Sequence, residues 1–571
     1  MTRRSFVGSC AAIAAGSQGK AASGPDAEFV AIANEYIDAT LANRPEFATM
    51  VGEHRYDNRL DDYSAAGRAR ALTNDHRCLD RLKNVDLEKL DRQNNIDCRI
   101  LRNRAEFEAW NATVLRPYAW NPMVYNPGGS LYLLLERDFA PLSVRLKSLG
   151  GRLNAIPGLL LSAKENLTDS TRIHTETALM QNAGTIALVR DVVTEHAAKV
   201  PGAREDLAPA QQRAVAALED WGRWLEHDLL PRAHRDFRLG PEIYRAKLRY
   251  SLDSDLTPGQ IHERAGRDLQ RAQEEIYRTA VVLYQGWSPN ADVSDRKRVV
   301  RAVLDKLAEN RPTADTIVPL AERVLGEATE LVRAKQLVTV PSTPLRIVVM
   351  PEYERGVAVA NCNSPGPLEK NGATFLNISP PPAKWSAAQV ASYFREYNNY
   401  MVRDLIAHEA MPGHYLQLAH ANEFRAATMV RAIFDSGPFV EGWAVYGERL
   451  MADNGFGGPE VRMQQLKMWL RTIINALLDV GIQDSGMTEQ QAMSLMMDEG
   501  FQEQSEAAGK WRRACLTSAQ LPTYWVGATA LFELRDDYEK KHGPITDWKS
   551  FHDRLLSFGS PAPRYVRELM L

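Results

Sequence analysis

Along most of the first 335 residues, hydrophobic side chains recur every three to four positions, the spacing of one face of an amphipathic helix. Three stretches show this clearly: 142–156, 208–230 and 261–284. Pro157-Gly158 follows the first stretch and is expected to interrupt its helix, because proline lacks a backbone donor. The chain from about residue 26 to residue 335 is therefore predicted to be mainly helical.

Near residue 341 the pattern changes to short runs rich in β-branched residues. Residues 345–350 and 373–378 are predicted to form strands, separated by a Gly/Pro/Asn-rich loop from Gly356 to Gly372. Helical spacing resumes at about Ser386 and covers the C-terminal part from residue 460. The predicted fold class is mainly α, with a small β element. This element lies shortly before a helix rich in candidate functional residues.

Composition narrows the functional classes. The 571 residues are 44% hydrophobic and 25% charged, with a formal net charge of -3, so a folded globular protein is expected and nucleic-acid binding is disfavoured. No apolar run approaches the roughly 20 residues that span a bilayer. Five cysteines are too few for a disulfide scaffold in a chain of this length.

The first 25 residues have the layout of a signal peptide. Arg3 and Arg4 precede a modest apolar stretch that ends at Ala15, which favours the twin-arginine export route. A lipoprotein signal ending at Cys10 fits less well, because almost no apolar segment precedes that cysteine. Export to the periplasm or the medium is the interpretation preferred here; the alternative is an unprocessed N-terminus on a cytoplasmic protein.

Two histidines with an adjacent carboxylate occur in the segment His408-Glu409-Ala410-Met411-Pro412-Gly413-His414. Imidazole is a frequent zinc ligand, and a neighbouring glutamate is the usual base. On a straight helix, however, positions i and i+6 differ by about 120° and about 9 Å, too far for one metal ion. A break at Pro412-Gly413 would bring His414 back beside His408. The alternative is a capping Pro-Gly pair between two unrelated histidines.

A second acidic cluster follows. Glu441 and Glu448 are seven residues apart, so both carboxylates lie on one face of the predicted helix. Two acids on a semi-buried face are costly unless they are paired or bind a cation. Glu441 would complete a set of three protein ligands and leave a fourth position for water. The alternative is ordinary pairing with Arg449 or Arg462.

The segments 408–417 and 441–448 resemble the signatures of the bacterial domain-of-unknown-function 885 family. The C-terminal segments Tyr524-Trp525-Val526-Gly527, Leu534-Arg535 and 551–556 also match its pattern, and the resemblance runs from about residue 28. That family is similar to gluzincin peptidases, which are large, mostly helical, two-lobed proteins with a deep cleft. The resemblance implies one zinc ion held by His408, His414 and Glu441, with Glu409 as the catalytic base.

Five further residues are candidates for the same site. Tyr524 could donate a hydrogen bond to a developing oxyanion, as gluzincin tyrosines do; the alternative is a packing role. Glu448, Arg535 and His552 are candidates for supporting a metal ligand or contacting substrate, although His552 is more simply a structural hydrogen-bonder. Where the family usually carries a histidine, this chain has Gln483, which can donate a hydrogen bond but cannot carry a proton.

Together these features predict an exported zinc-dependent hydrolase that cleaves peptide or amide bonds with metal-activated water. A helical lobe at residues 26–340 and a metal-site lobe at 341–571 are expected to form one continuous catalytic unit. Two alternatives remain open: a metal-containing binding protein without turnover, and a hydrolase of a non-peptide amide metabolite.

Overall fold

The computed structural model describes residues 24–350, 359–369 and 372–571, and it confirms the mainly α fold. The signal peptide expected at residues 1–25 lies almost wholly outside this described part. None of the described helices is both long enough and apolar enough to cross a membrane.

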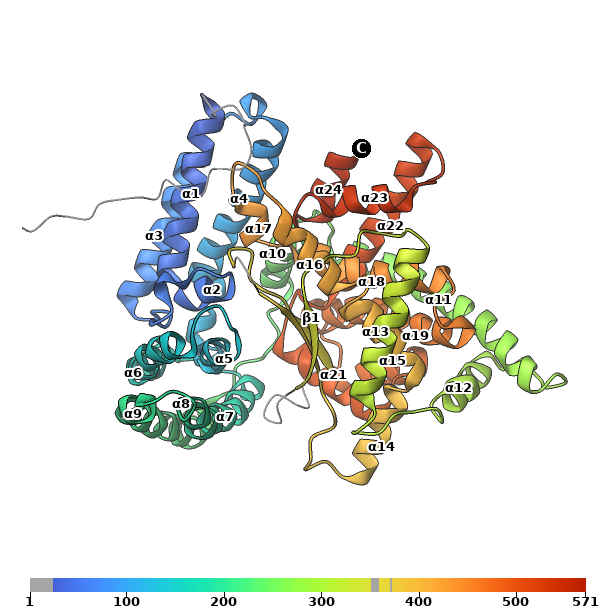
Figure 1. The fold of residues 1–571 in the computed structure, drawn as a ribbon, viewed down its shortest axis with the longest axis horizontal. Helices are drawn as coiled ribbons and strands as arrows, with labels where there is room; N and C mark the ends of the chain where they lie inside the picture. Colours follow the sequence, from blue (N-terminus) through green and yellow to red (C-terminus); the bar gives the residue numbers. More distant parts are fainter. Residues whose placement is uncertain (1–23, 351–358, 370–371) are drawn as a thin grey trace, which may run out of the picture.

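The first group of helices lies on the left in Figure 1. It consists of α1 (Pro25–Asn43), α2 (Pro45–Met50), α3 (Ala65–Leu82), α4 (Arg92–Trp110), α5 (Gly128–Glu136), α6 (Leu142–Asn166), α7 (Arg172–Ala187), α8 (Val193–Ala197) and α9 (Ala203–Trp224). The chain then continues through α10 (Pro241–Leu252), α11 (Pro258–Trp287), α12 (Arg296–Leu307) and α13 (Ile317–Ala334).

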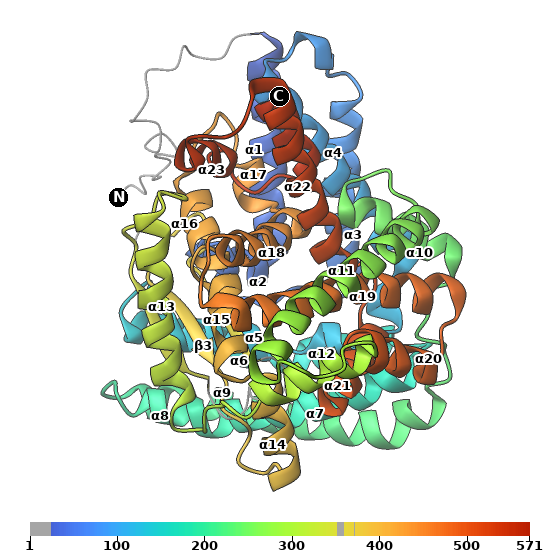
Figure 2. The ribbon, with the colours of Figure 1, turned by 90° about the vertical axis from the view of Figure 1, so that its right-hand side faces the viewer.

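The remaining helices follow a small sheet made of β1 (Leu345–Val349), β2 (Ala360–Asn363) and β3 (Thr374–Ile378). They are α14 (Ala387–Glu396), α15 (Asn399–Glu409), α16 (His414–Glu423), α17 (Val430–Ile433), α18 (Gly437–Asp453), α19 (Gly458–Ser485), α20 (Glu489–Ser494), α21 (Gln504–Leu516), α22 (Pro522–His542), α23 (Trp548–Leu556) and α24 (Pro563–Met570). Helix α18 packs against α15, α16, α19 and α22 and lies near the centre of Figure 2.

One expected helix boundary is wrong. Helix α6 continues through Pro157 as far as Asn166, although proline removes a backbone donor and was expected to interrupt the helix. The apolar face on both sides of the proline, including Ile156 and Leu159, is buried in one hydrophobic cluster. Packing of this continuous face therefore outweighs the loss of one hydrogen bond.

The sheet has one more strand than the sequence predicts. Its order is β1-β3-β2, with β1 parallel and β2 antiparallel to β3. Strand β2 falls inside the segment expected to be a loop, because Ala360-Asn361-Cys362-Asn363 contains no β-branched residue. Its pairing with β3 includes a 2.6 Å hydrogen bond from the Asn377 side-chain amide to Asn361. Hydrogen bonding to β3 therefore stabilises β2 as a strand, although its residues have a low intrinsic preference for this conformation.

The hydrophobic cores connect the two halves of the chain. One buried cluster combines residues of α13 with residues of α15 and α18, and another combines α10, α11 and α12 with α19. Each cluster contains residues from both sides of residue 340, which is the expected boundary between the two lobes. The division into lobes stays a prediction, but the helices that carry the candidate site pack on both halves.

Candidate metal centre

The break between α15 and α16 places the two histidines side by side. A Cβ atom added to Gly413 would overlap the backbone carbonyl of His408, so only glycine allows this close approach. The indole Nε1 of Trp443 donates a 2.8 Å hydrogen bond to the carbonyl oxygen of Pro412, which fixes the break against α18. The rings of His408 and His414 lie 4.8 Å apart, so the chain turns back as the sequence predicts.

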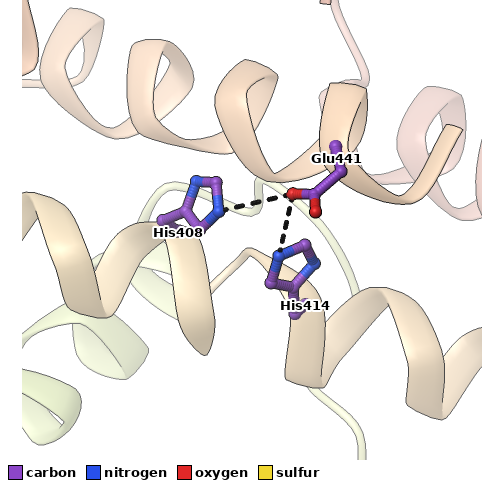
Figure 3. Close-up of side chains that lie close together, drawn as sticks. All are labelled: His408, His414 and Glu441. Carbon is purple, nitrogen blue, oxygen red and sulfur yellow. Dashed lines mark ion pairs between the residues drawn. The ribbon is translucent and has the colours of Figure 1, made fainter. Parts of the chain in front are cut away.

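Glu441 of α18 points at both imidazoles (Figure 3). Its Oε2 atom lies 3.7 Å from Nε2 of His408 and 3.4 Å from Nε2 of His414. Both distances exceed the usual length of a hydrogen bond. They are close to the separation of about 3.3–3.6 Å between two ligands of a tetrahedral zinc ion whose bonds are about 2.0–2.2 Å long. The same oxygen is buried without a hydrogen-bond partner, so the donor set fits a metal ion.

The three groups also influence each other's charge. Burial alone would lower the pKa of His408, but Glu441 and Glu448 hold it well above its usual value. Burial would likewise raise the pKa of Glu441, yet His408 and His414 hold it well below its usual range. In the absence of a cation, a proton on the His408 imidazole thus partly neutralises Glu441. A divalent cation would replace that proton, because metal ligands must be deprotonated.

Glu448 contacts the other side of the His408 ring. Its Oε1 atom lies 2.6 Å from Nδ1 of His408, and its side chain is 1% exposed. Asp404, one turn before His408, is also buried; burial and Glu448 raise its pKa well above the usual value. The alternative pairing of the two glutamates with arginines is wrong, since Arg449 and Arg462 pair with Glu275 and Asp453 instead.

Glu409, the last residue of α15, lies next to this donor set and is half-buried. No hydrogen bond or ion pair engages its carboxylate among the described residues. Strand β2 packs against α15, whereas β1 packs against α13. Burial raises the pKa of the β2 residue Cys362, and the Glu409 charge adds to this effect, so the edge strand β2 lies close to Glu409.

Close packing of α18 and α22 brings Tyr524 near enough to Glu441 for an electrostatic interaction. An added Cβ on Gly442 would overlap the backbone of Gly527, so these two glycines let the helices touch. Glu441 precedes the first glycine, and Tyr524 lies one turn before the second. Burial raises the pKa of the Tyr524 phenol, and the charge of Glu441 raises it further. The phenol oxygen accepts a 3.0 Å hydrogen bond from the guanidinium of Arg513.

Two sequence candidates, His552 and Arg535, make no contact with the three donor residues among the interactions of the described chain. His552 is fully buried and contacts the hydroxyl of Tyr446 and the carbonyl oxygen of Leu337. These contacts agree with the simpler interpretation of His552 as a structural hydrogen-bonding residue. Burial lowers the pKa of His552 to about 4. Arg535 is half-buried, pairs with Asp536 and also interacts with Tyr446. None of these contacts leads toward the three donors.

Gln483 is likewise a buried structural residue. Its side-chain oxygen accepts a 2.9 Å hydrogen bond from the backbone N–H of Leu239, and its amide donates to the carbonyl oxygen of Thr517 at 3.3 Å. With 2% of its surface exposed, it does not present a group to substrate. The resemblance places a histidine at this position. Here Gln483 of α19 instead connects its helix to the backbone at Leu239 and at Thr517.

Sequence reasoning missed two basic residues, Lys510 and Arg513 of α21. Lys510 is close enough to Glu441 for an electrostatic interaction, and Arg513 contacts Tyr524. Their three-residue spacing places them on one helix face, but surface helices commonly carry such pairs. No local signal in the sequence connects α21 with the segment at residue 441.

Comparison with known proteins supplies the family. The bacterial protein family of unknown function DUF885 matches residues 45–570. A solved structure from Shewanella oneidensis, described as a candidate lipoprotein of unknown function, is 34% identical; the match covers 96% of this chain and 100% of that chain with a TM-score of 0.80. A candidate lipoprotein from Colwellia psychrerythraea shares the fold, with 17% identity, coverage of 96% and 98%, and a TM-score of 0.79. No curated protein matches the chain.

Proposed function

The chain belongs to the DUF885 family of bacterial proteins of unknown function, and from that premise we propose that it is an exported zinc-dependent hydrolase of peptide or amide bonds. The observation that carries the proposal is the convergence of His408, His414 and Glu441, whose ligand atoms all lie within 4.8 Å of one another. A zinc ion held there would supply Lewis-acid chemistry, polarising a carbonyl oxygen and making water more acidic. The likeness to gluzincin peptidases is part of this proposal.

Glu409 is the base in this proposal. It follows the ligand His408 directly in the sequence, and its carboxylate has no hydrogen-bond partner in the part of the chain that the structure describes. It can therefore accept a proton from the attacking water and later deliver that proton to the leaving nitrogen. Glu441 and Glu448 cannot serve this purpose equally well, because both already interact with imidazoles.

Tyr524 is the donor to the developing oxyanion. Because its oxygen accepts a hydrogen bond from Arg513, its own O–H proton is free to be donated to substrate. Hydrolysis of an amide builds negative charge on the carbonyl oxygen, and a positioned donor stabilises that charge. The guanidinium would increase the acidity of the phenol as the charge develops.

An extended peptide could add to the edge strand β2. Strand β2 lies at one edge of the sheet and packs against α15. Backbone groups on the outer edge of a sheet can bind a substrate strand through main-chain hydrogen bonds. Such binding would place a peptide bond alongside Glu409.

Export is supported by two observations. Arg3 and Arg4 precede an apolar stretch, and the two similar solved structures are described as candidate lipoproteins. Cell fractionation of the wild type, of the double variant Arg3→Lys/Arg4→Lys and of Cys10→Ser tests this part. Retention of the double variant in the cytoplasm indicates the twin-arginine route, and release of only the cysteine variant from membranes indicates lipidation. A wild-type protein that stays in the cytoplasm contradicts export.

The enzymatic proposal is tested with a mixture of peptides. Purified protein is incubated with the mixture, with and without a chelator, and products are identified by mass spectrometry. The proposal predicts cleavage that the chelator abolishes. Bound metal without cleavage of any peptide would favour a binding protein, and cleavage confined to non-peptide amides would favour a specialised metabolic hydrolase.

A further inference from the structure

Lys510 of α21 is a buried basic residue. Its side chain is 5% exposed, and no hydrogen bond or ion pair reaches its ammonium group within the described ranges. The acid on the preceding helical turn, Glu506, is already bound by Arg471 and by the hydroxyl of Tyr397. By contrast, the buried Lys467 has a carboxylate partner, Glu396, at 2.8 Å. Among the described residues, Lys510 therefore has no carboxylate within hydrogen-bond distance, and the charges of Glu506 and Glu441 act on it only from farther away.

Arg513 is a second cation without an acidic partner in the described part of the chain. Its Nη2 atom lies 3.0 Å from the Tyr524 hydroxyl and 3.0 Å from Oε1 of Gln520, both uncharged groups. These contacts fix the direction of the guanidinium while leaving its charge unpaired. Because Arg513 lies one turn after Lys510 on α21, the two positive charges are neighbours.

The two basic residues are close enough to the candidate metal centre to interact with groups around it. Lys510 interacts electrostatically with Glu441, and Arg513 is bonded to Tyr524, which also interacts with Glu441. Burial, together with the charges of Arg471 and Arg513, lowers the pKa of Lys510 well below its usual value. A buried lysine without a direct partner loses its proton more easily, and an incoming carboxylate would favour the charged ammonium form.

We propose that the substrate presents a carboxylate to Lys510 and Arg513 while its scissile amide lies at the metal centre. This assignment rests on the proposed function and adds the substrate class to it. A carboxylate matches the site because it can accept charge-assisted hydrogen bonds from an ammonium and a guanidinium together. The carboxylate can come from a free C-terminus or from an acidic side chain, and the experiment distinguishes these sources.

The test measures binding, so it does not depend on turnover. Zinc-loaded protein with the substitution Glu409→Gln, which removes the proposed base, is titrated with three peptides by calorimetry. They are acetyl-Ala-Ala-Ala with a free carboxylate, the same peptide as its amide, and acetyl-Ala-Glu-Ala amide. At least one carboxylate peptide is expected to bind about tenfold to a hundredfold more tightly than the neutral amide, the value of a charged hydrogen bond.

Variants at residue 510 test whether Lys510 is responsible for the preference for a carboxylate. Lys510→Met keeps the length of the side chain without its charge and is expected to abolish the preference, whereas Lys510→Arg retains most of it. Lys540→Met, on the exposed face of α22, is the control and should change nothing. Equal binding of all three peptides, or a preference that survives in Lys510→Met, overturns the proposal.

Failure of the two proposals can be told apart. If peptides bind through Lys510 but zinc-loaded wild type cleaves none of them, carboxylate recognition stands and the hydrolase proposal fails. If cleavage occurs equally well for the free carboxylate, the amide and the acidic peptide, the hydrolase proposal stands and carboxylate recognition fails. Melting temperatures of the Lys510 variants show whether folding is intact; removal of an unpaired buried charge should not lower them.

Discussion

Oε1 of Glu448 lies 2.6 Å from Nδ1 of His408, on the side of the ring opposite Nε2, which faces Glu441. A carboxylate in this position keeps the proton on Nδ1 and leaves the Nε2 lone pair available to a metal ion. Glu448 is 1% exposed, so its carboxylate contacts the His408 ring and is shielded from molecules in solution. The relationship explains why two acids occupy one face of α18.

Glu448→Gln should weaken zinc binding by about 10–100-fold, the usual effect of removing a partner that orients a metal ligand. Competition with a chromogenic chelator measures the affinity. The matched control is Glu423→Gln, an exposed position at the end of α16, which should bind zinc as the wild type does. An unchanged affinity in Glu448→Gln would show that His408 needs no such partner.

Gly413→Ala should destabilise the fold by about 1–3 kcal/mol, because the added methyl group overlaps the carbonyl of His408. It should also reduce zinc binding, since relief of the overlap separates His414 from His408. Gly158→Ala is the control: no atom lies within 4 Å of its added Cβ, and alanine in a helix interior should stabilise the protein by about 0.5–1 kcal/mol. Urea unfolding measures both effects, and equal stability of the two variants would contradict the overlap.

Much of the candidate centre follows from local sequence. The unusual spacing of His408 and His414 requires a break, and Pro412-Gly413 provides residues that form one. Glu441 and Glu448 share a face because seven residues are close to two helical turns. In each case the interacting groups belong to one helix or to two consecutive helices, where spacing alone determines geometry.

Other parts depend on contacts between distant segments. The approach of Tyr524 to Glu441 depends on Gly442 and Gly527 meeting across two helices. Glu506 does not form an ion pair with Lys510, one turn away, because it is bound by Arg471, 35 residues away in the sequence. Strand β2 exists because β3 pairs with it. No periodicity within a single segment indicates such contacts.

Glu409→Gln should leave bound zinc unchanged and lower kcat by about 10²–10⁴-fold, because the amide keeps the shape of the side chain but cannot accept a proton. Elemental analysis gives the zinc content and steady-state assays give the rate. A variant that retains both zinc and near-normal turnover would exclude Glu409 as the base. Loss of zinc would instead assign it a structural contribution to the metal site.

Tyr524→Phe should lower kcat and kcat/KM together by about 10²–10³-fold at constant zinc content, because the lost hydrogen bond forms only in the transition state. Tyr538→Phe, in the same helix α22, serves as the control and should keep full activity. A raised KM at constant kcat would make Tyr524 a substrate-binding residue. No change in either constant would leave it a packing tyrosine.

The central claim is that His408, His414 and Glu441 hold one zinc ion that hydrolysis requires. The most direct measurement is a zinc titration of chelator-treated protein, followed by the rate of hydrolysis of a peptide that the untreated protein cleaves. The rate should rise in proportion to added zinc, reach its plateau at one equivalent per chain, and stay at the baseline throughout for Glu441→Gln at the same zinc concentrations. Full activity before any zinc is added, or an equal rise in Glu441→Gln, would contradict the claim.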